Sequence, residues 1–255
     1  RYDHFKIMRP YLEQFFNMNI NYVLSLLPTS TVYSRNAIFS GFFPDELNER
    51  YPEQEFDMKN NNSSLNQYES KFFKDQLKRA GFEHKSMYYH KIWAVEEGNK
   101  FASKFNDYIK KDIISLVVNF VDLLAHKSSQ TDVLKEIIKD ESGFRSAVKI
   151  WFENSWLLKV LKKLSEEKFT VIITSDHGSI RVNNSVMVSA DKAASSGVRY
   201  KYGRNLNTKY KNALIIKDPK EYKLPVFGPQ PSYLIAKEDS YFIYPNEAKK
   251  YQIKF

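Results

Sequence analysis

The sequence contains no cysteine. Disulfide bonds and thiolate ligands are therefore excluded, and any metal ion must be held by nitrogen and oxygen atoms. No apolar run approaches the roughly 18 residues of a membrane-spanning helix. The best candidate, residues 116–125, is interrupted by Asn119 and Asp122. The first residues also lack the pattern of a signal peptide. We therefore expect no membrane insertion and a cytoplasmic location.

The composition favours an ordered globular protein, since 42% of the 255 residues are hydrophobic and 15% are aromatic. A chain of this length can bury one large core or two unequal ones. The net charge of +9 indicates either attraction to phosphate groups or a lysine-rich solvated surface. The lysines are scattered along the sequence, which favours the second interpretation without excluding the first. Because the chain begins with Arg1, we expect a fragment of a longer protein.

Apolar strands alternate with long helices along most of the chain. The strands are expected at residues 22–27, 113–121, 171–174 and 212–216, with a hairpin from 232–235 and 241–244. The helices are expected at residues 4–17, 32–42, 65–80, 131–139 and 143–164. This order predicts an α/β fold with a mostly parallel sheet covered by helices on both faces. Residues 45–110 are polar and aromatic-rich, and we assign them to a cap insertion in a core formed by 1–44 and 111–255.

Three of the predicted strands end in residues that can hold a cation or attack phosphorus. They are followed by Thr31, by Asp122 and His126, and by Asp176 and His177. Parallel strands deliver their carboxyl ends to one edge of a sheet, so these side chains are expected to converge there. Carboxylate and imidazole groups are among the ligands that zinc takes in proteins.

The histidine motifs also have simpler interpretations. Asp122 and His126 are four residues apart and share one face of a helix, where a helix cap and a surface histidine explain them equally well. Asp176 and His177 are adjacent, so they can share an ion only in a turn, which Gly178 favours.

Thr31 opens the predicted helix at 32–42, and two roles remain open for it. It is either the N-cap of that helix or a nucleophile whose hydroxyl is activated by a divalent cation. In the second case, the backbone N–H groups from Val32 onward would cradle a phosphate group.

Four short motifs resemble the alkaline phosphatase superfamily. Residues 28–44 are similar to its nucleophile segment and to the Thr-x-Thr, helix, Gly-x-x-Pro layout of nucleotide pyrophosphatase/phosphodiesterases. The Asp-x-x-x-His motif at 122–126 and the Ser-Asp-His-Gly motif at 175–178 follow in the same order. Within the superfamily the chain most resembles PglZ domains, especially the effector domain of PorX-type response regulators. The segments that carry this closer resemblance are residues 1–3, 35–41 and 199–205.

The resemblance implies an alkaline-phosphatase-like fold and a centre with two zinc ions. Asp122 and His126 would bind one ion, and Asp176, His177 and the Thr31 oxygen would bind the other. Thr31 would attack phosphorus and form a phosphothreonine intermediate that water then hydrolyses. The substrates implied are nucleotide or oligonucleotide phosphodiesters.

Two expected zinc ligands of the family fall outside the sequence. One is an Asp that would precede Arg1, and the other is a late His that would follow Phe255. We therefore expect the sequence to be clipped at both ends, with each ion lacking one ligand within it.

Five further residues are candidates for substrate binding. Val32 would contribute its backbone N–H, whereas Arg35 and Asn36 could contact substrate or buttress the site. Arg204 and Asn205 could recognise phosphate, although a solvated loop is the simpler explanation. The sequence does not separate these alternatives.

The resemblance to PorX-type regulators also implies partners. These are an upstream receiver domain, a histidine kinase, a sigma factor or a component of type IX secretion, and a second copy of the chain in a homodimer. A second hypothesis is therefore a metal-containing regulatory module that binds partner proteins with little or no turnover, using the Tyr- and Phe-rich cap. A third is a basic nucleic-acid-binding module, whose affinity would depend on salt and not on metal.

Overall fold

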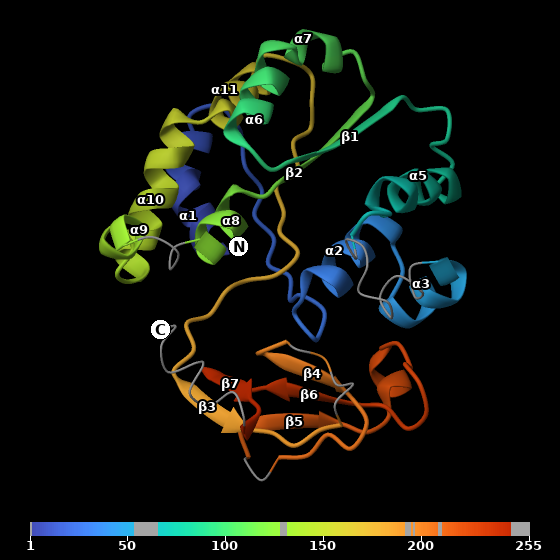
Figure 1. The fold of residues 1–255 in the computed structure, drawn as a ribbon. Coiled ribbons are helices and arrows are strands. Elements are labelled where there is room, and N and C mark those ends of the chain that lie inside the picture. Colours follow the sequence, from blue (N-terminus) through green and yellow to red (C-terminus); the bar gives the residue numbers. More distant parts are fainter. Residues whose placement is uncertain are drawn as a thin grey trace. The chain divides into compact units, whose positions relative to one another are not determined.

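A computed structural model of the chain describes residues 2–53, 66–127, 132–191, 195, 197–208 and 211–245. The chain forms two compact units, whose helices and strands are labelled in Figure 1. Unit 1 comprises Arg1–Val23 and Leu77–Thr174, and unit 2 comprises Leu24–Gln76 and Ser175–Phe255. Each unit has its own strands and its own clusters of buried side chains.

Unit 1 contains a parallel pair of strands, β1 (Met87–Ile92) and β2 (Ile113–Val118), which run in register from Met87 opposite Ile113 to Ile92 opposite Val118. The helices of this unit are α1 (Tyr2–Leu12), α6 (Val95–Ser103), α7 (Phe105–Tyr108), α8 (Phe120–Lys127), α9 (Asp132–Ile137), α10 (Glu141–Asn154) and α11 (Trp156–Ser165). Parallel strands need a crossover connection, which α6 and α7 supply. Phe101 and Phe105 of this crossover pack with Trp156 of α11 in the core beneath the strands.

A second core in unit 1 joins α1 to the helical pair α10 and α11. Leu12 of α1 is buried with Phe152 of α10 and Leu161 of α11. The sequence predicts one continuous helix over residues 143–164. This is wrong, because the helix is interrupted at Ser155. Ser155 is extended and its hydroxyl accepts a hydrogen bond from the N–H of Leu158 at 3.2 Å, so it caps α11 as a new helix.

Unit 2 contains α2 (Thr31–Ser40), α3 (Pro44–Arg50), the start of α5 (Glu69–Arg79) and a short 3-10 helix, Pro219–Tyr222. Its strands are β3 (Asn184–Met187), β4 (Tyr200–Gly203), β5 (Ala213–Ile216), β6 (Ser232–Ala236) and β7 (Ser240–Ile243). β3 and β7 pair in parallel, whereas β4 and β5 flank β6 in an antiparallel sheet.

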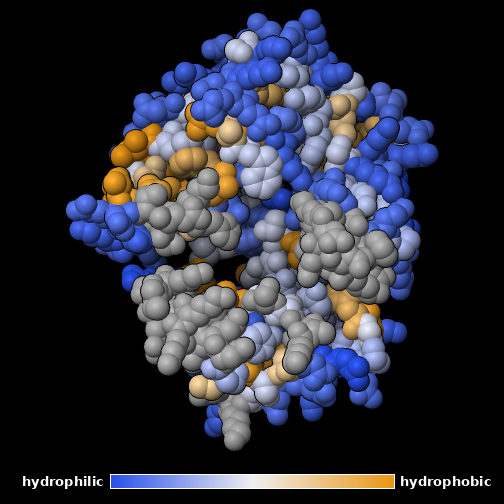
Figure 2. All heavy atoms as spheres, in the orientation of Figure 1, coloured by the Kyte–Doolittle hydropathy of each residue, from blue (hydrophilic) through white to orange (hydrophobic). Residues whose placement is uncertain are grey.

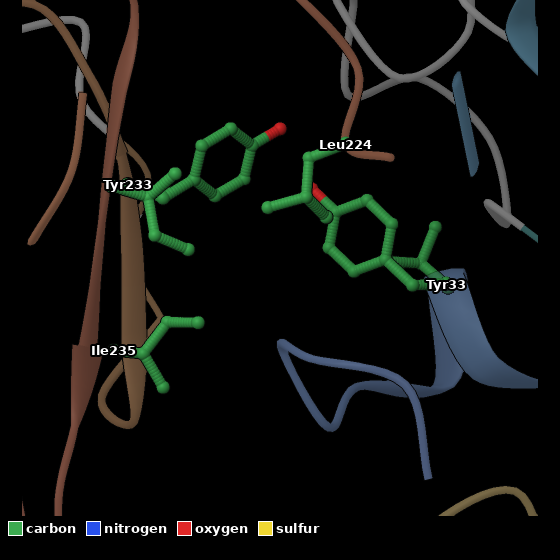
Figure 3. Close-up of a cluster of buried hydrophobic side chains, with 6 residues drawn as sticks. Tyr33, Leu224, Tyr233 and Ile235 are labelled. Atoms are coloured by element: carbon green, nitrogen blue, oxygen red, sulfur yellow. The ribbon is translucent and has the colours of Figure 1, made fainter. Parts of the chain in front are cut away.

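The helix α2 is packed on this antiparallel sheet. Tyr33, on the buried face of α2, lies in one cluster with Leu224 and with Tyr233 and Ile235 of β6 (Figure 3). These side chains are between 0 and 9% exposed. The position of α2, and hence of Thr31 at its start, is therefore fixed by a hydrophobic core and not by a surface contact.

Two predicted strands are absent. Residues 22–27 and 171–174 form no strand, and Val23, Leu24 and Ile172 are 82, 99 and 84% exposed. Both segments lie where the chain passes from one unit to the other. An apolar sequence is compatible with a strand, but a strand also needs a hydrogen-bonded neighbour, and neither segment has one among the described residues. The strand predicted at 113–121 is shorter, because α8 begins at Phe120.

The predicted hairpin at the end of the chain is also wrong. β6 and β7 are both formed, but β7 pairs with β3 and β6 pairs with β4 and β5. The described residues therefore form an α/β structure with three small sheets, two parallel and one antiparallel, and not a single large parallel sheet. β1 lies inside the range that the sequence assigned to a cap; the division into core and cap stays a prediction.

The face of the molecule in Figure 2 is mostly hydrophilic, as the excess of lysine and arginine suggests. The exposed hydrophobic side chains of unit 1 include Val133, Ile137 and Ile150, which are 57–67% exposed on α9 and α10. Among the described helices, none combines the length and the apolar composition needed to cross a membrane.

Candidate functional site

Thr31 is the first residue of α2, and it is not the N-cap. That position belongs to Ser30, whose backbone is extended and whose carbonyl accepts the N–H groups of Tyr33 and Ser34 at 3.0 and 2.9 Å. The Ser30 side chain makes no capping hydrogen bond. The first N–H groups of a helix have no intrahelical partner, so those of Thr31 and Val32 are available to an anion at this end.

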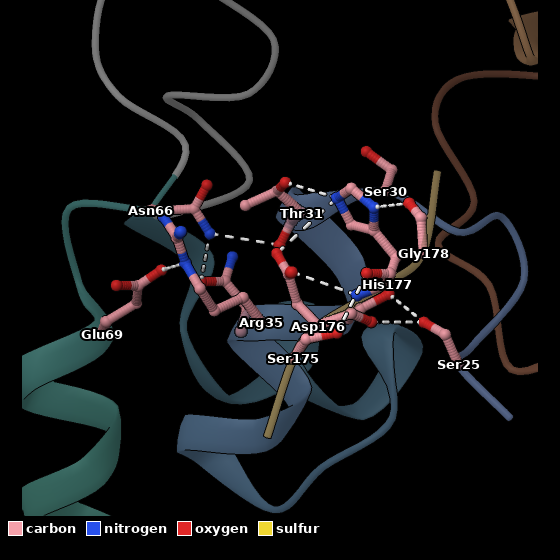
Figure 4. A network of polar contacts seen from close by, with 12 residues as sticks. Ser25, Ser30, Thr31, Arg35, Asn66, Glu69, Ser175, Asp176, His177 and Gly178 are labelled. Carbon is pink, nitrogen blue, oxygen red and sulfur yellow. Dashed lines mark hydrogen bonds and ion pairs between the residues drawn. The ribbon is translucent and has the colours of Figure 1, made fainter. Parts of the chain in front are cut away.

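The hydroxyl of Thr31 contacts the imidazole of His177. Thr31 Oγ1 lies 2.9 Å from His177 Nε2, and His177 Nδ1 lies 2.8 Å from the carbonyl oxygen of Gly178 (Figure 4). A carbonyl oxygen only accepts hydrogen bonds, so Nδ1 carries a proton, and in the neutral imidazole Nε2 carries the lone pair. The Thr31 hydroxyl therefore donates to Nε2.

Asp176 adds a carboxylate to the same place. Its Oδ1 accepts the backbone N–H of His177 at 3.0 Å, and its Oδ2 lies 3.7 Å from His177 Nε2. The Asp176 and His177 side chains are only 19% and 16% exposed. Unit 2 thus brings together a hydroxyl, an imidazole nitrogen and a carboxylate oxygen.

This donor set fits zinc. Two ligands of a tetrahedral zinc ion at about 2.0–2.2 Å lie roughly 3.3 Å apart, and the observed donor separations of 2.9 and 3.7 Å bracket that value. A zinc-binding histidine usually donates its other N–H to a carbonyl or carboxylate, as His177 does to Gly178. Within the described ranges, no group of three or more His, Asp or Glu side chains is gathered; the third donor beside Asp176 and His177 is the hydroxyl of Thr31.

Ser25 fixes the main chain of Asp176. Its hydroxyl donates to the carbonyl oxygen of Asp176 at 2.5 Å and lies 2.9 Å from the hydroxyl of Ser34, which is buried on α2. Because the Ser25 hydrogen is directed at Asp176, Ser34 donates to Ser25. One hydroxyl therefore links the Asp-His segment to the helix that begins at Thr31. Nothing in the sequence around Ser25 indicates this role.

Arg35 and Asn36, two of the predicted substrate-binding residues, contact the segment before and within α5. Arg35 Nε forms an ion pair with Glu69, which is 0% exposed. The side-chain oxygen of Asn36 accepts a hydrogen bond from Asn66 Nδ2 at 3.0 Å. These contacts favour the buttressing role of Arg35 and Asn36. The sequence did not indicate Asn66 or Glu69 at all, because their partners are 30 or more positions away.

Arg204 and Asn205, two more of the five predicted substrate-binding residues, lie just after β4. Asn205 has a φ of 52° and donates to both carboxylate oxygens of Asp191 at 3.1 and 3.2 Å, while the carbonyl of Arg204 accepts the N–H of Asp191. The Asn205 amide thus bonds to the segment that precedes β4, and phosphate recognition by Arg204 and Asn205 stays a prediction.

Tyr200, at the start of β4, is a residue that the sequence did not single out. Its hydroxyl lies 3.5 Å from the hydroxyl of Ser30, which donates to it. Its ring meets the Tyr33 ring edge-on at 5.9 Å. Burial raises the pKa of Tyr200 above its ordinary value of 10.0, so the phenol stays protonated beside the start of α2 at neutral pH.

Asp122 and His126 belong to unit 1, one helical turn apart on α8. This helix directly follows β2, and Asn119 ties its start to β1 through hydrogen bonds from its N–H and side-chain amide to the carbonyl of Ile92, at 3.2 and 3.4 Å. Thr31, Asp176 and His177 belong to unit 2. A single centre that includes both groups stays a prediction.

One family model matches the chain, and it covers residues 1–252. It describes the BREX system PglZ alkaline phosphatase-like domain. The matched range contains every residue proposed above for the site, in both units. No curated protein matches the chain.

Proposed function

The chain belongs to the PglZ family of alkaline phosphatase-like domains, and from this premise we propose that it is a zinc-dependent phosphodiesterase whose nucleophile is Thr31. The observation that carries the proposal is the hydrogen bond from Thr31 Oγ1 to His177 Nε2 at 2.9 Å. A threonine hydroxyl is a weak nucleophile unless a base or a metal ion lies next to it. In this chain the neighbour is an imidazole whose lone pair already faces the hydroxyl.

Different residues of the chain bind the phosphate group, attack phosphorus and hold the site in position. The N–H groups at the start of α2 receive phosphate oxygens, because the amino-terminal end of a helix carries partial positive charge. Attack forms a bond from Thr31 Oγ1 to phosphorus as the Thr31 hydroxyl loses its proton, while the bond from phosphorus to the leaving oxygen breaks and that oxygen gains a proton from water. Water then breaks the new bond and restores the hydroxyl. Ser25 and Ser34 hold Asp176 and His177 beside Thr31 throughout.

Asp176, His177 and Thr31 would hold one zinc ion, and Asp122 and His126 a second. Bound zinc supplies Lewis-acid stabilisation of the negative charge that develops on the entering and leaving oxygens. The lone pair of His177 Nε2 either accepts the Thr31 proton or binds zinc, so these two roles are alternatives at that atom.

The proposed substrates are nucleotide or oligonucleotide phosphodiesters. The net charge of +9 supports an anionic substrate, and the resemblance of the nucleophile segment to nucleotide phosphodiesterases supports the diester. The resemblance to PorX-type regulators supports a role as the effector domain of a response regulator. Its proposed partners are an upstream receiver domain, a histidine kinase, and a sigma factor or secretion component.

Replacement of the nucleophile tests the proposal. With the full-length protein and zinc, Thr31→Ala is expected to lower kcat for bis(p-nitrophenyl) phosphate by at least about 10³-fold, because residues that act as one catalytic unit lose most of the rate when one is removed. Wild-type activity should disappear with a chelator and return with zinc.

The matched control is Thr208→Ala in the same unit. The Thr208 hydroxyl donates to the carbonyl of Met187 at 2.9 Å, and Thr208 lies far from the proposed nucleophile in the sequence. This variant should keep the wild-type rate. If Thr31→Ala hydrolyses the diester as fast as wild type, the assignment of the nucleophile is wrong.

A metal-containing module that binds partner proteins is the second candidate function. The exposed hydrophobic side chains of α9 and α10, Val133, Ile137 and Ile150, are the observation that favours it. This alternative predicts bound metal without turnover of any phosphoester. Chelator-sensitive turnover by the wild-type protein therefore decides against it.

A further inference from the structure

The side-chain amide of Asn66 contacts the main chain of the proposed nucleophile. Asn66 Nδ2 lies 3.3 Å from the carbonyl oxygen of Thr31 and 3.0 Å from the side-chain oxygen of Asn36 (Figure 4). An amide nitrogen has two hydrogens, so Asn66 can donate one to each acceptor. Both acceptors belong to α2, five positions apart.

This contact is buried, and a neighbouring ion pair supports it. Asn66 is 8% exposed and Asn36 is 0% exposed. Three residues after Asn66, Glu69 pairs with Arg35, the neighbour of Asn36 on α2. A carboxylate that is 0% exposed is costly to bury without its partner, so the ion pair fixes the start of α5 against α2. The Asn66 amide, three residues before Glu69, is therefore held in position next to the carbonyl of Thr31.

The stiffness of threonine connects this carbonyl to the hydroxyl. Threonine is branched at Cβ and is split between two χ1 rotamers in a helix. The contact with His177 selects one of them, and within that rotamer the direction of Oγ1 follows the orientation of the backbone at residue 31. A hydrogen bond that holds the Thr31 carbonyl thus also holds Oγ1 relative to His177 Nε2.

We propose that Asn66 is a positioning residue, which aligns the Thr31 hydroxyl for attack by holding the first turn of α2. The inference rests on the proposed function, because alignment matters only if Thr31 reacts. It assigns no contact with substrate to Asn66. A misplacement of about 1 Å at a reacting atom costs on the order of 100-fold in rate, so the contribution of Asn66 belongs to kcat and not to KM.

Two substitutions at this position separate the hydrogen bonds from packing. Asn66→Ala removes the amide, and Asn66→Asp keeps its shape while replacing both N–H donors with an oxygen. In the full-length protein with zinc, both variants are expected to lower kcat for bis(p-nitrophenyl) phosphate about 10- to 100-fold, with KM within about twofold of wild type.

The matched control is Asn154→Ala. Asn154 Nδ2 also donates to a helix carbonyl, that of Ile150 at 2.8 Å, but on α10 in unit 1. This variant should keep the wild-type kcat. Rates are expressed per folded protein, so a general loss of stability does not imitate the effect.

Hydrogen exchange gives a readout that does not need turnover. Backbone amides of residues 31–36 should exchange faster in Asn66→Ala than in wild type, while those of α10 should not change. If wild type hydrolyses the diester and Asn66→Ala keeps its kcat, or raises KM alone, the positioning role is wrong. If neither the wild type nor any variant hydrolyses the diester, the proposed function fails by itself. In that case, equal hydrogen exchange at residues 31–36 in Asn66→Ala and wild type overturns the positioning role.

Discussion

At the residue scale, the site depends on hydrogen bonds that fix which group donates and which group accepts. The carbonyl of Gly178 leaves the lone pair of His177 on Nε2, and that lone pair faces Thr31. The sequence predicts that Thr31, Asp176 and His177 share one place, because each follows an apolar segment. Their supports were not predictable. Ser25, Asn66 and Glu69 are polar residues without a motif, and only the folded chain brings them to their partners.

Ser25 offers a test of these supports. Ser25→Ala removes the link between the Asp176 carbonyl and the buried Ser34 hydroxyl. We expect the free energy of unfolding to fall by about 1–2 kcal/mol, because a part-buried acceptor and a buried hydroxyl lose a partner. The phosphodiesterase rate should fall as well, since Asp176 and His177 lose a fixed position. Urea denaturation and the hydrolysis assay measure the two effects.

The control for Ser25 is Ser165→Ala, in which an exposed serine hydroxyl bonded to the carbonyl of Lys162 is removed. Surface changes of this kind stay within about 0.5 kcal/mol. Equal stability and equal rates for the Ser25 and Ser165 variants would show that Ser25 supports nothing at the site.

At the scale of helices and strands, the sequence predicted helices better than strands. The amphipathic pattern that predicts α1, α5 and α9 depends only on residues close together in the sequence, and the structure forms helices in these places. The sequence did not predict the boundary between α10 and α11 at Ser155, because the helical pattern of apolar residues continues on both sides of this capping serine. Strand pairing depends on distant partners, which is why β6 and β7 do not form the predicted hairpin and why residues 22–27 form no strand.

Asp112 joins the amino-terminal ends of β1 and β2. Its carboxylate accepts hydrogen bonds from the Ser86 hydroxyl at 2.7 Å, from the Ser86 N–H at 2.8 Å and from Lys85 Nζ at 3.2 Å. These bonds, led by that from the Ser86 hydroxyl, lower the pKa of Asp112 from 3.8 to about 2. The contribution to stability is therefore complete above about pH 4 and is lost as the pH falls from 4 towards 2.

Asp112→Asn should remove this part of the acid dependence. An amide does not ionise, so the free energy of unfolding of the variant should fall less steeply than that of wild type between pH 4 and pH 2. Denaturation curves at several pH values measure both slopes. Identical slopes would mean that the ionised carboxylate of Asp112 does not hold the two strands.

At the scale of the whole molecule, the proposed residues lie in both units. Thr31, Asp176 and His177 are in unit 2, and Asp122 and His126 are in unit 1. The sequence treated them as the carboxyl edge of one sheet, a rule that needs a single parallel sheet. The described residues form three smaller sheets instead. Asp122 and His126 follow the strand β2, but the segments before Thr31 and Asp176 form no strand, so the rule does not show how the two groups combine.

The family membership extends across both units, because the matched range runs from residue 1 to residue 252. A two-zinc centre would require residues from both of them. The three donors of unit 2 fit one ion by their chemistry and spacing, and the helix α8 offers two further positions at one turn's spacing.

The central claim is that Thr31 attacks phosphorus, and the stereochemical course of hydrolysis tests it most directly. The full-length protein would hydrolyse a chiral phosphorothioate diester in water enriched in oxygen-18, and the configuration of the product would be determined. An in-line displacement inverts phosphorus. Attack by Thr31 followed by attack of water gives two inversions, so the account predicts net retention of configuration. Net inversion would mean that water attacks the substrate directly, and would contradict a threonine nucleophile.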